Sequence, residues 1–302
     1  MRKHSRATVY ALALVAIVSS RSSGQIGQQL GQVRYNSGQN VAAVFEGWEK
    51  NADGTFDLVF GYMNRNYVEE PEIPIGPNNN FSPGPADQGQ PTHFYPRRQQ
   101  FMFKVRVPAD FGKKELVWTL TRSGRTEKAY ATLLLEEELT EIVLSQNRRG
   151  IASDSVKAEQ NKPPTVSIDG PAERTVSAGE TLTLTASASD DGIPKPPPAG
   201  PGAVAASDGG PLLTVREQPS TQAIVKPSRR GAAVTWTHWR GPGRLTFDPM
   251  TSLVRDGKVT AKVTFSQPGT YVIRAYADDG VVTTPADVTV IVGQSPKAVD
   301  KP

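Results

Sequence analysis

The sequence predicts an all-β protein with two antiparallel domains, and three observations carry that prediction. Two matching stretches, Thr181 to Gly192 and Gly269 to Gly280, alternate inward and outward residues, and both close with Asp-Asp-Gly. Period-two alternation that ends in a glycine turn is typical of a half-buried antiparallel strand. In addition, 25 prolines and 27 glycines favour short strands and frequent turns over long helices.

The length of 302 residues corresponds to two domains of ordinary size. Shifts in composition along the chain give the expected boundaries. We expect a signal peptide (1–24), a flexible lead-in (25–40), a first β domain (41–144), a linker (145–162), a second β domain (163–293) that contains a disordered insertion (192–230), and a tail (294–302).

The first domain is expected to be a β-sandwich or a twisted antiparallel sheet with a long cover loop. Its clearest hairpin joins Val41–Trp48 to Thr55–Asn64, because the intervening Asp and Gly accept left-handed backbone angles. Further strands are expected at Gln100–Val107, Lys114–Arg122 and Thr126–Leu135. The pattern of Glu136–Leu144 fits either a short helix or a last strand.

The cover loop, Arg65–Arg98, contains seven prolines and no periodic pattern. Irregular segments of this length inside a compact domain are usually functional or disordered. Apolar and aromatic residues such as Tyr67, Ile73 and Phe94 are spread along it, whereas a disordered linker usually lacks them. We therefore expect an ordered loop that packs over the sheet.

Short alternating segments recur through the second domain. They are Thr165–Asp169, Thr181–Ala188, Ala232–Trp239, Leu245–Phe247, Gly257–Phe265, Thr270–Ala277 and Asp287–Val292. About seven short strands with a central tryptophan, here Trp236, predict an immunoglobulin-like sandwich.

Short segments of each domain resemble those of a known protein family. The first domain resembles a family of uncharacterised exported bacterial proteins in Phe45-Glu-Gly-Trp48, Asn51-Ala-Asp-Gly-Thr-Phe56, Phe60-Gly-Tyr-Met-Asn-Arg-Asn66, Ile73-Pro-Ile-Gly-Pro-Asn78 and Gly89-Gln-Pro-Thr-His-Phe94. That resemblance implies export and no particular activity. The second domain resembles polycystic-kidney-disease-type (PKD) domains in Val234-Thr-Trp-Thr237, Gly241-Pro-Gly243, Pro268-Gly-Thr-Tyr271, Asp278-Asp-Gly280 and Val288-Thr-Val290. It departs from them after Trp236, where an aromatic-Gly-Asp-Gly turn is absent.

The N-terminus has the pattern of a cleaved export signal. A basic start is followed by the apolar run Ala7–Val18 and by Ser22-Ser-Gly24, so we expect cleavage before Gln25. A run of this length is too short to span ~30 Å of hydrocarbon as a helix. The sequence therefore predicts a secreted or periplasmic protein with no membrane span after cleavage. Because the chain has no cysteine, a lipoprotein anchor and thiol chemistry are excluded.

The net charge of the exported chain argues against nucleic acid as a partner. The formal charge of +4 comes from four cations of the signal peptide, Arg2, Lys3, Arg6 and Arg21. Without them 30 Lys and Arg balance 30 Asp and Glu. Binding to phosphates requires a surplus of cations, which the exported chain lacks.

Two acidic pairs form a candidate metal site. In an immunoglobulin-like sandwich the loops that carry Asp190-Asp191 and Asp278-Asp279 lie at the same end, so their carboxylates are expected to converge. Four carboxylates near one point suit Ca²⁺, which takes six to eight oxygen ligands. The alternative, which we favour, is that each Asp caps its own turn and that no cofactor is bound.

Residues on and beside the cover loop are the candidates for ligand binding, namely Trp48, Tyr62, Arg65, His93, Tyr95, Arg97 and Arg98. Their rings would stack on a sugar or peptide, and their guanidinium groups would bind carboxylate or sulfate. The alternative is that the rings anchor the loop to the sheet while the arginines pair with nearby acids. His238, which lies beside two tryptophans, is expected to be structural.

The absence of known catalytic motifs favours a function without catalysis. The sequence contains no nucleophile elbow, zinc-protease helix, phosphate-binding loop or dinucleotide fingerprint. The leading hypothesis is a non-enzymatic exported module that binds or scaffolds at the bacterial cell envelope, with an envelope protein or a polysaccharide as partner. The alternatives are a carbohydrate- or cell-wall-binding module and a hydrolase that uses carboxylates such as Glu69 and Glu70.

Overall fold

The prediction of an all-β fold is confirmed. The computed structural model describes residues 34–140, 143, 161–193, 223–225 and 231–294, and these contain fifteen strands and one short 3₁₀ helix. The stretch from Tyr35 onward forms one compact unit. The expected signal peptide, nearly all of the linker, most of the insertion and most of the tail lie outside the described residues.

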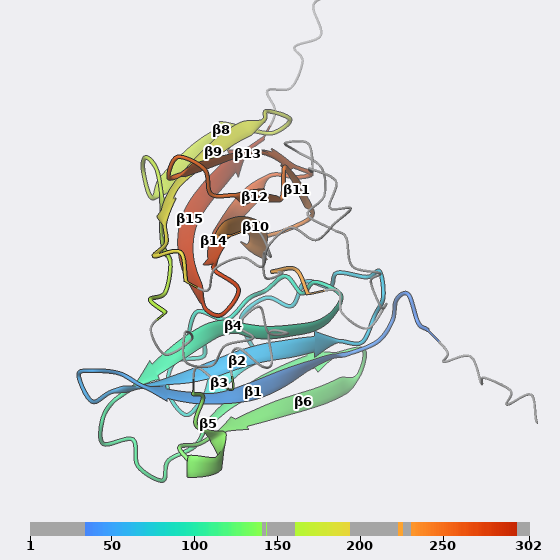
Figure 1. Cartoon of the computed structure of the whole chain (residues 1–302). Coiled ribbons are helices and arrows are strands. Elements are labelled where there is room, and N and C mark those ends of the chain that lie inside the picture. Colours follow the sequence, from blue (N-terminus) through green and yellow to red (C-terminus); the bar gives the residue numbers. More distant parts are fainter. Residues whose placement is uncertain (1–33, 141–142, 144–160, 194–222, 226–230, 295–302) are drawn as a thin grey trace, which may run out of the picture. The chain divides into compact units, whose positions relative to one another are not determined.

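The first half of the chain is a sandwich of two three-stranded sheets (Figure 1). One sheet has the order β1-β2-β4, formed by β1 (Val41–Lys50), β2 (Phe56–Asn64) and β4 (Arg97–Val107). The other has the order β3-β5-β6, formed by β3 (Asn79–Ser82), β5 (Leu116–Arg122) and β6 (Arg125–Ala131). Of the two expected architectures, the sandwich is therefore the one that forms.

Aromatic side chains from both sheets make the core of this first sandwich. Phe60 of β2 packs edge-on against Trp118 of β5, with ring centroids 6.0 Å apart, and Phe81 of β3 stacks on the same indole at 5.8 Å. Phe60 and Trp118 are fully buried. The inward positions of β2 are those that the period-two pattern assigned to the core.

The cover loop is ordered, as expected, and buried asparagines hold it in place. Asn79 donates from Nδ2 to the carbonyls of Ile73 and Pro91, both at 2.8 Å, and accepts a bond from the Trp118 indole. Asn64 donates to the carbonyls of Glu69 and Phe94. Because an irregular segment has no ladder partners, these side chains satisfy its backbone groups. Strand β3, which lies inside this loop, was not predicted.

The end of the first sandwich combines both expected alternatives. Leu135–Glu137 forms the 3₁₀ helix η1, and Glu138 then makes a parallel bridge to Trp48 of β1. The following residues 141, 142 and 144 of the predicted segment are outside the described part of the chain.

The second half is a sandwich of a four-stranded and a five-stranded sheet. The four-stranded sheet has the order β11-β13-β9-β7, with β7 (Thr165–Ile168), β9 (Leu182–Ser189), β11 (Leu245–Asp248) and β13 (Lys258–Phe265). The five-stranded sheet has the order β12-β10-β14-β15-β8, with β8 (Glu173–Ser177), β10 (Ala233–Arg240), β12 (Thr251–Leu253), β14 (Gly269–Asp278) and β15 (Thr283–Gly293). The edge strands β8 and β12 were not predicted.

Strand order and two side chains define this second sandwich as immunoglobulin-like. In that fold one sheet has the strand order A-B-E-D and the other C-F-G. Here β7, β9, β13 and β11 take the places of A, B, E and D, and β10, β14 and β15 those of C, F and G. Trp236 on β10 is fully buried in the core. The hydroxyl of Tyr271, near the start of β14, donates to the Gln267 carbonyl at 2.6 Å, which is the tyrosine corner of such domains.

Candidate functional site

The structure buries all four rings among the predicted ligand-binding residues. Trp48, Tyr62, His93 and Tyr95 are 5%, 1%, 3% and 8% exposed, so none of them offers a free face for stacking. This burial does not support the functional interpretation, in which the rings stack on a sugar or peptide, and it agrees with the alternative in which they anchor the loop. The physical reason is that the cover loop turns its rings inward, as the alternative interpretation proposed, because an irregular segment needs apolar anchors.

Trp48 and Tyr62 also lie too far apart to share one surface. Along the β1–β2 ladder Trp48 is opposite Leu58, whereas Tyr62 is opposite Ala43. Four strand residues separate the two positions, which corresponds to about 13 Å. The Trp48 indole donates to the Leu134 carbonyl at 2.7 Å, and the Tyr62 ring packs against Phe94.

The three arginines are engaged with neighbours in the first sandwich. Arg98 forms a 2.7 Å ion pair with Glu46. Burial raises the pKa of Glu46, and the charge of Arg98 opposes that rise. Arg97 lies 4.1 Å from the centroid of the Tyr67 ring and donates to the Arg65 carbonyl. Arg65 is exposed and pairs with Glu127 at 3.6 Å.

The cover loop meets the second sandwich through a row of hydrogen bonds. The Trp239 indole donates to the Gly89 carbonyl at 3.0 Å, and Arg240 donates to the Gln90 carbonyl at 2.8 Å. Both terminal nitrogens of Arg240 also bind the Asp87 carboxylate, at 2.6 and 2.9 Å. These bonds to Arg240 lower the pKa of Asp87. We call this contact between the cover loop and the five-stranded sheet the joint.

Aromatic packing continues the joint onto β4. Trp239 and Tyr276 belong to the core cluster of the first sandwich, and the Trp239 ring lies 5.9 Å from that of Phe103. The Tyr276 hydroxyl donates to the Met102 carbonyl at 2.6 Å. The Arg274 guanidinium lies 3.8 Å from the centroid of the Trp239 ring, while its other side binds Asp287. The outer face of β10 and β14 is thus covered by protein.

Two histidines from different sandwiches stack at the edge of the joint. The rings of His93 and His238 lie 4.1 Å apart at 24°. His93 Nε2 is 3.1 Å from Glu70, and the backbone N–H of His238 donates to the Tyr95 hydroxyl at 2.8 Å. Burial lowers the pKa of His238 to about 3, with the neighbouring His93 as the second cause, while nearby carbonyls of Arg240 and Gly241 act in the opposite direction.

Three ring nitrogens of this pair, His93 Nδ1 and both nitrogens of His238, have no partner in hydrogen-bonding geometry among the described residues. They do not form a metal site, because the lone pairs of two stacked rings lie in separate planes and do not converge on one point. No group of three His, Cys, Asp or Glu side chains in the described ranges has an arrangement that holds a metal.

The acidic pairs lie near each other but are used as turn caps. Each of the four carboxylates accepts a backbone N–H two or three residues further along the chain, for example Asp190 from Gly192 and Asp279 from Val281. Burial raises the pKa of Asp190, and the charges of Asp279 and Asp191 add to the rise. Asn161 donates to Asp279 at 2.9 Å. Calcium at these residues therefore stays a prediction to be tested.

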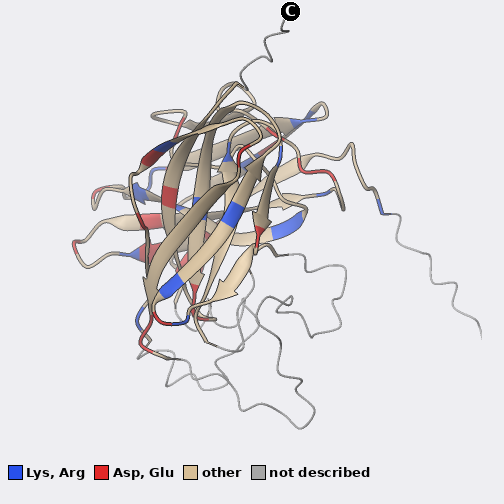
Figure 2. Ribbon diagram, turned by 90° about the horizontal axis from the view of Figure 1, so that it is seen from above, with Lys and Arg blue, Asp and Glu red and all other residues tan. Residues whose placement is uncertain are grey.

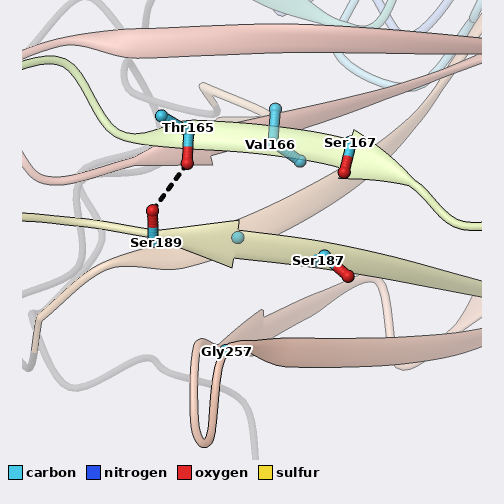
Figure 3. Close-up of a pocket in the computed structure, with 7 residues that line it drawn as sticks. Thr165, Val166, Ser167, Ser187, Ser189 and Gly257 are labelled. Atoms are coloured by element: carbon cyan, nitrogen blue, oxygen red, sulfur yellow. Dashed lines mark hydrogen bonds between the residues drawn. The ribbon is translucent and has the colours of Figure 1, made fainter.

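A shallow hollow of about 380 Å³ lies on the outer side of β7 and β9. Small side chains line it. Figure 3 shows the hydroxyls of Thr165 and Ser189 pointing toward each other, and their hydrogen bond is 2.7 Å long. Neither a ring nor a charged group lines it. Since binding sites combine apolar walls with placed polar groups, this hollow is a poor candidate for ligand recognition.

The charge distribution agrees with the neutral balance that the sequence gives for the chain after residue 24. Figure 2 shows Lys and Arg interleaved with Asp and Glu along the strands. Salt bridges join opposite charges from different elements, such as Lys104 of β4 with Glu49 of β1 and Arg122 of β5 with Glu69 of the cover loop. In the described part of the chain, no helix has the length and apolar character needed to cross a membrane.

Comparison with known proteins gives no family. No protein-family model and no curated protein matches the chain. Solved structures match at low similarity. The fibronectin(III)-like modules of Clostridium thermocellum CbhA are 16% identical, with a TM-score of 0.23 over 84% of this chain and 94% of that one. Domains D00-D0 of Intimin are 10% identical, with a TM-score of 0.24 over 83% and 99%. Domains 4 and 5 of the S-layer protein SbsC are 11% identical, with a TM-score of 0.23 over 84% and 98%. The fold assignment above rests on strand order and on the tyrosine corner.

The residues that make the joint were not predicted from the sequence, namely Trp239, Arg240, Arg274 and Tyr276. A signal was present, because Trp239 falls on the opposite face of its strand from the core residue Trp236. A large ring at an outward position indicates that something covers that face.

Proposed function

We propose that this protein is a non-enzymatic scaffold of the bacterial cell envelope, exported to the periplasm or secreted. In this proposal its two sandwiches act as one stiff unit that holds a bound envelope protein at a fixed spacing. The observation that carries the proposal is the joint. The segment expected to recognise a ligand is instead bonded to the second sandwich.

Stiffness follows from the kind of contact. Interfaces between domains of one chain are usually polar and permit relative motion. This joint combines a charge-assisted bidentate pair, Arg240 with Asp87, with rings of both halves in one buried core. A bidentate pair fixes geometry, and ring packing resists sliding.

Carbohydrate or cell-wall binding is the second candidate function. Sugar-binding sites need exposed ring faces, and the four candidate rings are at most 8% exposed. A hydrolase is the third. Its candidate carboxylates have structural partners, since Glu69 binds Arg122 and Glu70 binds His93. The scaffold is favoured over both because it requires no free catalytic or stacking group.

Two measurements on the exported chain test the proposal at pH 7.5. Because the chain has no cysteine, Lys128→Cys and Lys262→Cys place one label on an exposed site of each sandwich. A scaffold gives one narrow label-to-label distance distribution by electron paramagnetic resonance and no binding on a glycan array. A broad distribution contradicts it. Saturable glycan binding without product release supports the second function, and product release supports the third.

A further inference from the structure

The stacked histidines are the only pair of titratable rings shared by the two sandwiches among the described aromatic contacts. His93 comes from the cover loop and His238 from β10, and they are 3% and 2% exposed. Both rings therefore leave water when the joint forms. Burying an imidazole favours its neutral form, since a charge loses hydration there.

We propose that His93 and His238 form an acid-sensitive latch, whose protonation releases the second sandwich from the cover loop while each sandwich stays folded. This inference rests on the joint that also underlies the proposed function, and it adds a regulation to it. An envelope scaffold with this latch keeps its spacing at neutral pH and loses it in acid.

The geometry limits the closed latch to one proton. Two rings 4.1 Å apart cannot both carry a positive charge without strong repulsion in a site that excludes water. Released histidines are in water and each binds a proton below a pKa of about 6.5. The released form therefore binds more protons in acid than the closed form, so a fall in pH shifts the equilibrium toward release.

The groups that face the pair determine the pH window. His93 faces Glu70 through its Nε2 atom, Glu72 through a backbone bridge, and the ring of Tyr95 at 5.0 Å. His238 faces the ring of Tyr271 at 5.6 Å and the hydroxyl of Tyr95. Of these groups, only the glutamates carry negative charge near neutral pH.

As the pH falls, His238 and Glu72 shift the equilibrium between the closed and released forms in opposite directions. The pKa of His238 is lowered to about 3 in the closed form, so closure is strongest above pH 6.5 and weakens as pH falls toward 3. Burial raises the pKa of Glu72, which favours the closed form once that carboxyl is protonated. Asp87 keeps its charge to lower pH because Arg240 lowers its pKa. Release therefore begins as the pH falls below about 6.5, and its slope approaches tenfold in the equilibrium per pH unit about one unit lower, less the opposing contribution of Glu72.

The test uses the doubly labelled exported chain, with labels at Lys128→Cys and Lys262→Cys, at pH 7.5 and 5.0. The expected result is a narrow distance distribution at pH 7.5 and a second, broad component at pH 5.0. His238→Phe keeps a ring in the stack but cannot take up a proton, so it should stay narrow at both values. Far-ultraviolet circular dichroism should keep its strand signal at pH 5.0.

A matched control variant separates the effect of histidine protonation from a pH-independent weakening of the joint. Asp87→Asn removes a partner of Arg240 that is charged at both pH values, so its distribution should be broader at pH 7.5 and still broaden in acid. An acid response that persists in His238→Phe overturns the latch, as does loss of the strand signal at pH 5.0. A distribution that is narrow at both pH values in the parent chain contradicts only the latch. One that is broad at pH 7.5 contradicts the scaffold as well.

Discussion

Strands β13 and β10 belong to the same immunoglobulin-like sandwich and show what distinguishes its two outer faces. On β13 burial alternates strictly, with Lys258, Thr260, Lys262 and Thr264 exposed between core residues. On β10 seven of eight residues are buried, so both of its faces are covered. Outward positions of β13 carry small hydroxyls and lysines, whereas β10 places Trp239 outward. Large outward side chains thus indicate the face that docks.

The largest expected effect comes from removing the ring that distinguishes the two faces. Trp239→Ala leaves a cavity between the sandwiches, and truncating a buried aromatic side chain costs about 3–5 kcal/mol. Thr260→Ala on the open face is the matched control and should change the free energy of unfolding by less than about 0.5 kcal/mol. Urea unfolding followed by circular dichroism measures both. Equal effects would mean that the two outer faces do not differ.

A strand could be predicted from the sequence when the pattern that specifies it lies within the strand itself. Alternation within one segment predicted β2, β9, β13 and β14, because inward and outward positions are visible in the strand itself. Strands β3, β8 and β12 were missed, since segments of three to five residues gain their order from neighbours that are distant in sequence.

The candidate site was predicted less well than the fold. His93 and Tyr95 were singled out as candidate ligand-binding residues, but whether a ring faces solvent or another domain depends on which surfaces meet. The joint connects positions about 150 residues apart in the sequence, such as Trp239 and Gly89. No pattern within either segment specifies that meeting, although the outward Trp239 restricts it to one face of the second sandwich.

Removing the hydroxyl of Tyr276 tests the covered face with a smaller change to the packing than Trp239→Ala. Tyr276→Phe keeps the ring but leaves the buried Met102 carbonyl without its donor, which costs about 1–3 kcal/mol. Tyr130→Phe is the control, because Tyr130 is 53% exposed and should tolerate the change. Thermal unfolding compares the two variants. If Tyr130→Phe proved the more destabilising, the assignment of covered and open faces would be wrong.

The histidine latch predicts a stability difference that grows as pH falls. At pH 7, His238→Phe should leave the free energy of unfolding equal to the parent's or raise it by up to about 1 kcal/mol, because it removes two unpartnered buried nitrogens. At pH 5 the unfolded parent binds a proton that His238 in the closed form does not, since its pKa there is about 3. The variant should then gain up to about 2 kcal/mol more, and less where the released form takes up the same proton. Urea titrations at both pH values measure this, and a difference that does not grow in acid would contradict the lowered pKa.

The smallest effect on stability is expected at the two acidic turns of the second sandwich, Asp190-Asp191 and Asp278-Asp279. Their carboxylates already accept backbone N–H groups, which satisfies the turn without a cation. A calcium chelator should therefore leave the melting temperature unchanged. Asp279→Asn tests the same turn from inside, since its Oδ1 atom can still accept from Val281 while a carboxylate ligand for Ca²⁺ is lost. If the chelator lowers the melting temperature of the parent chain and Asp279→Asn abolishes that response, the turns hold calcium.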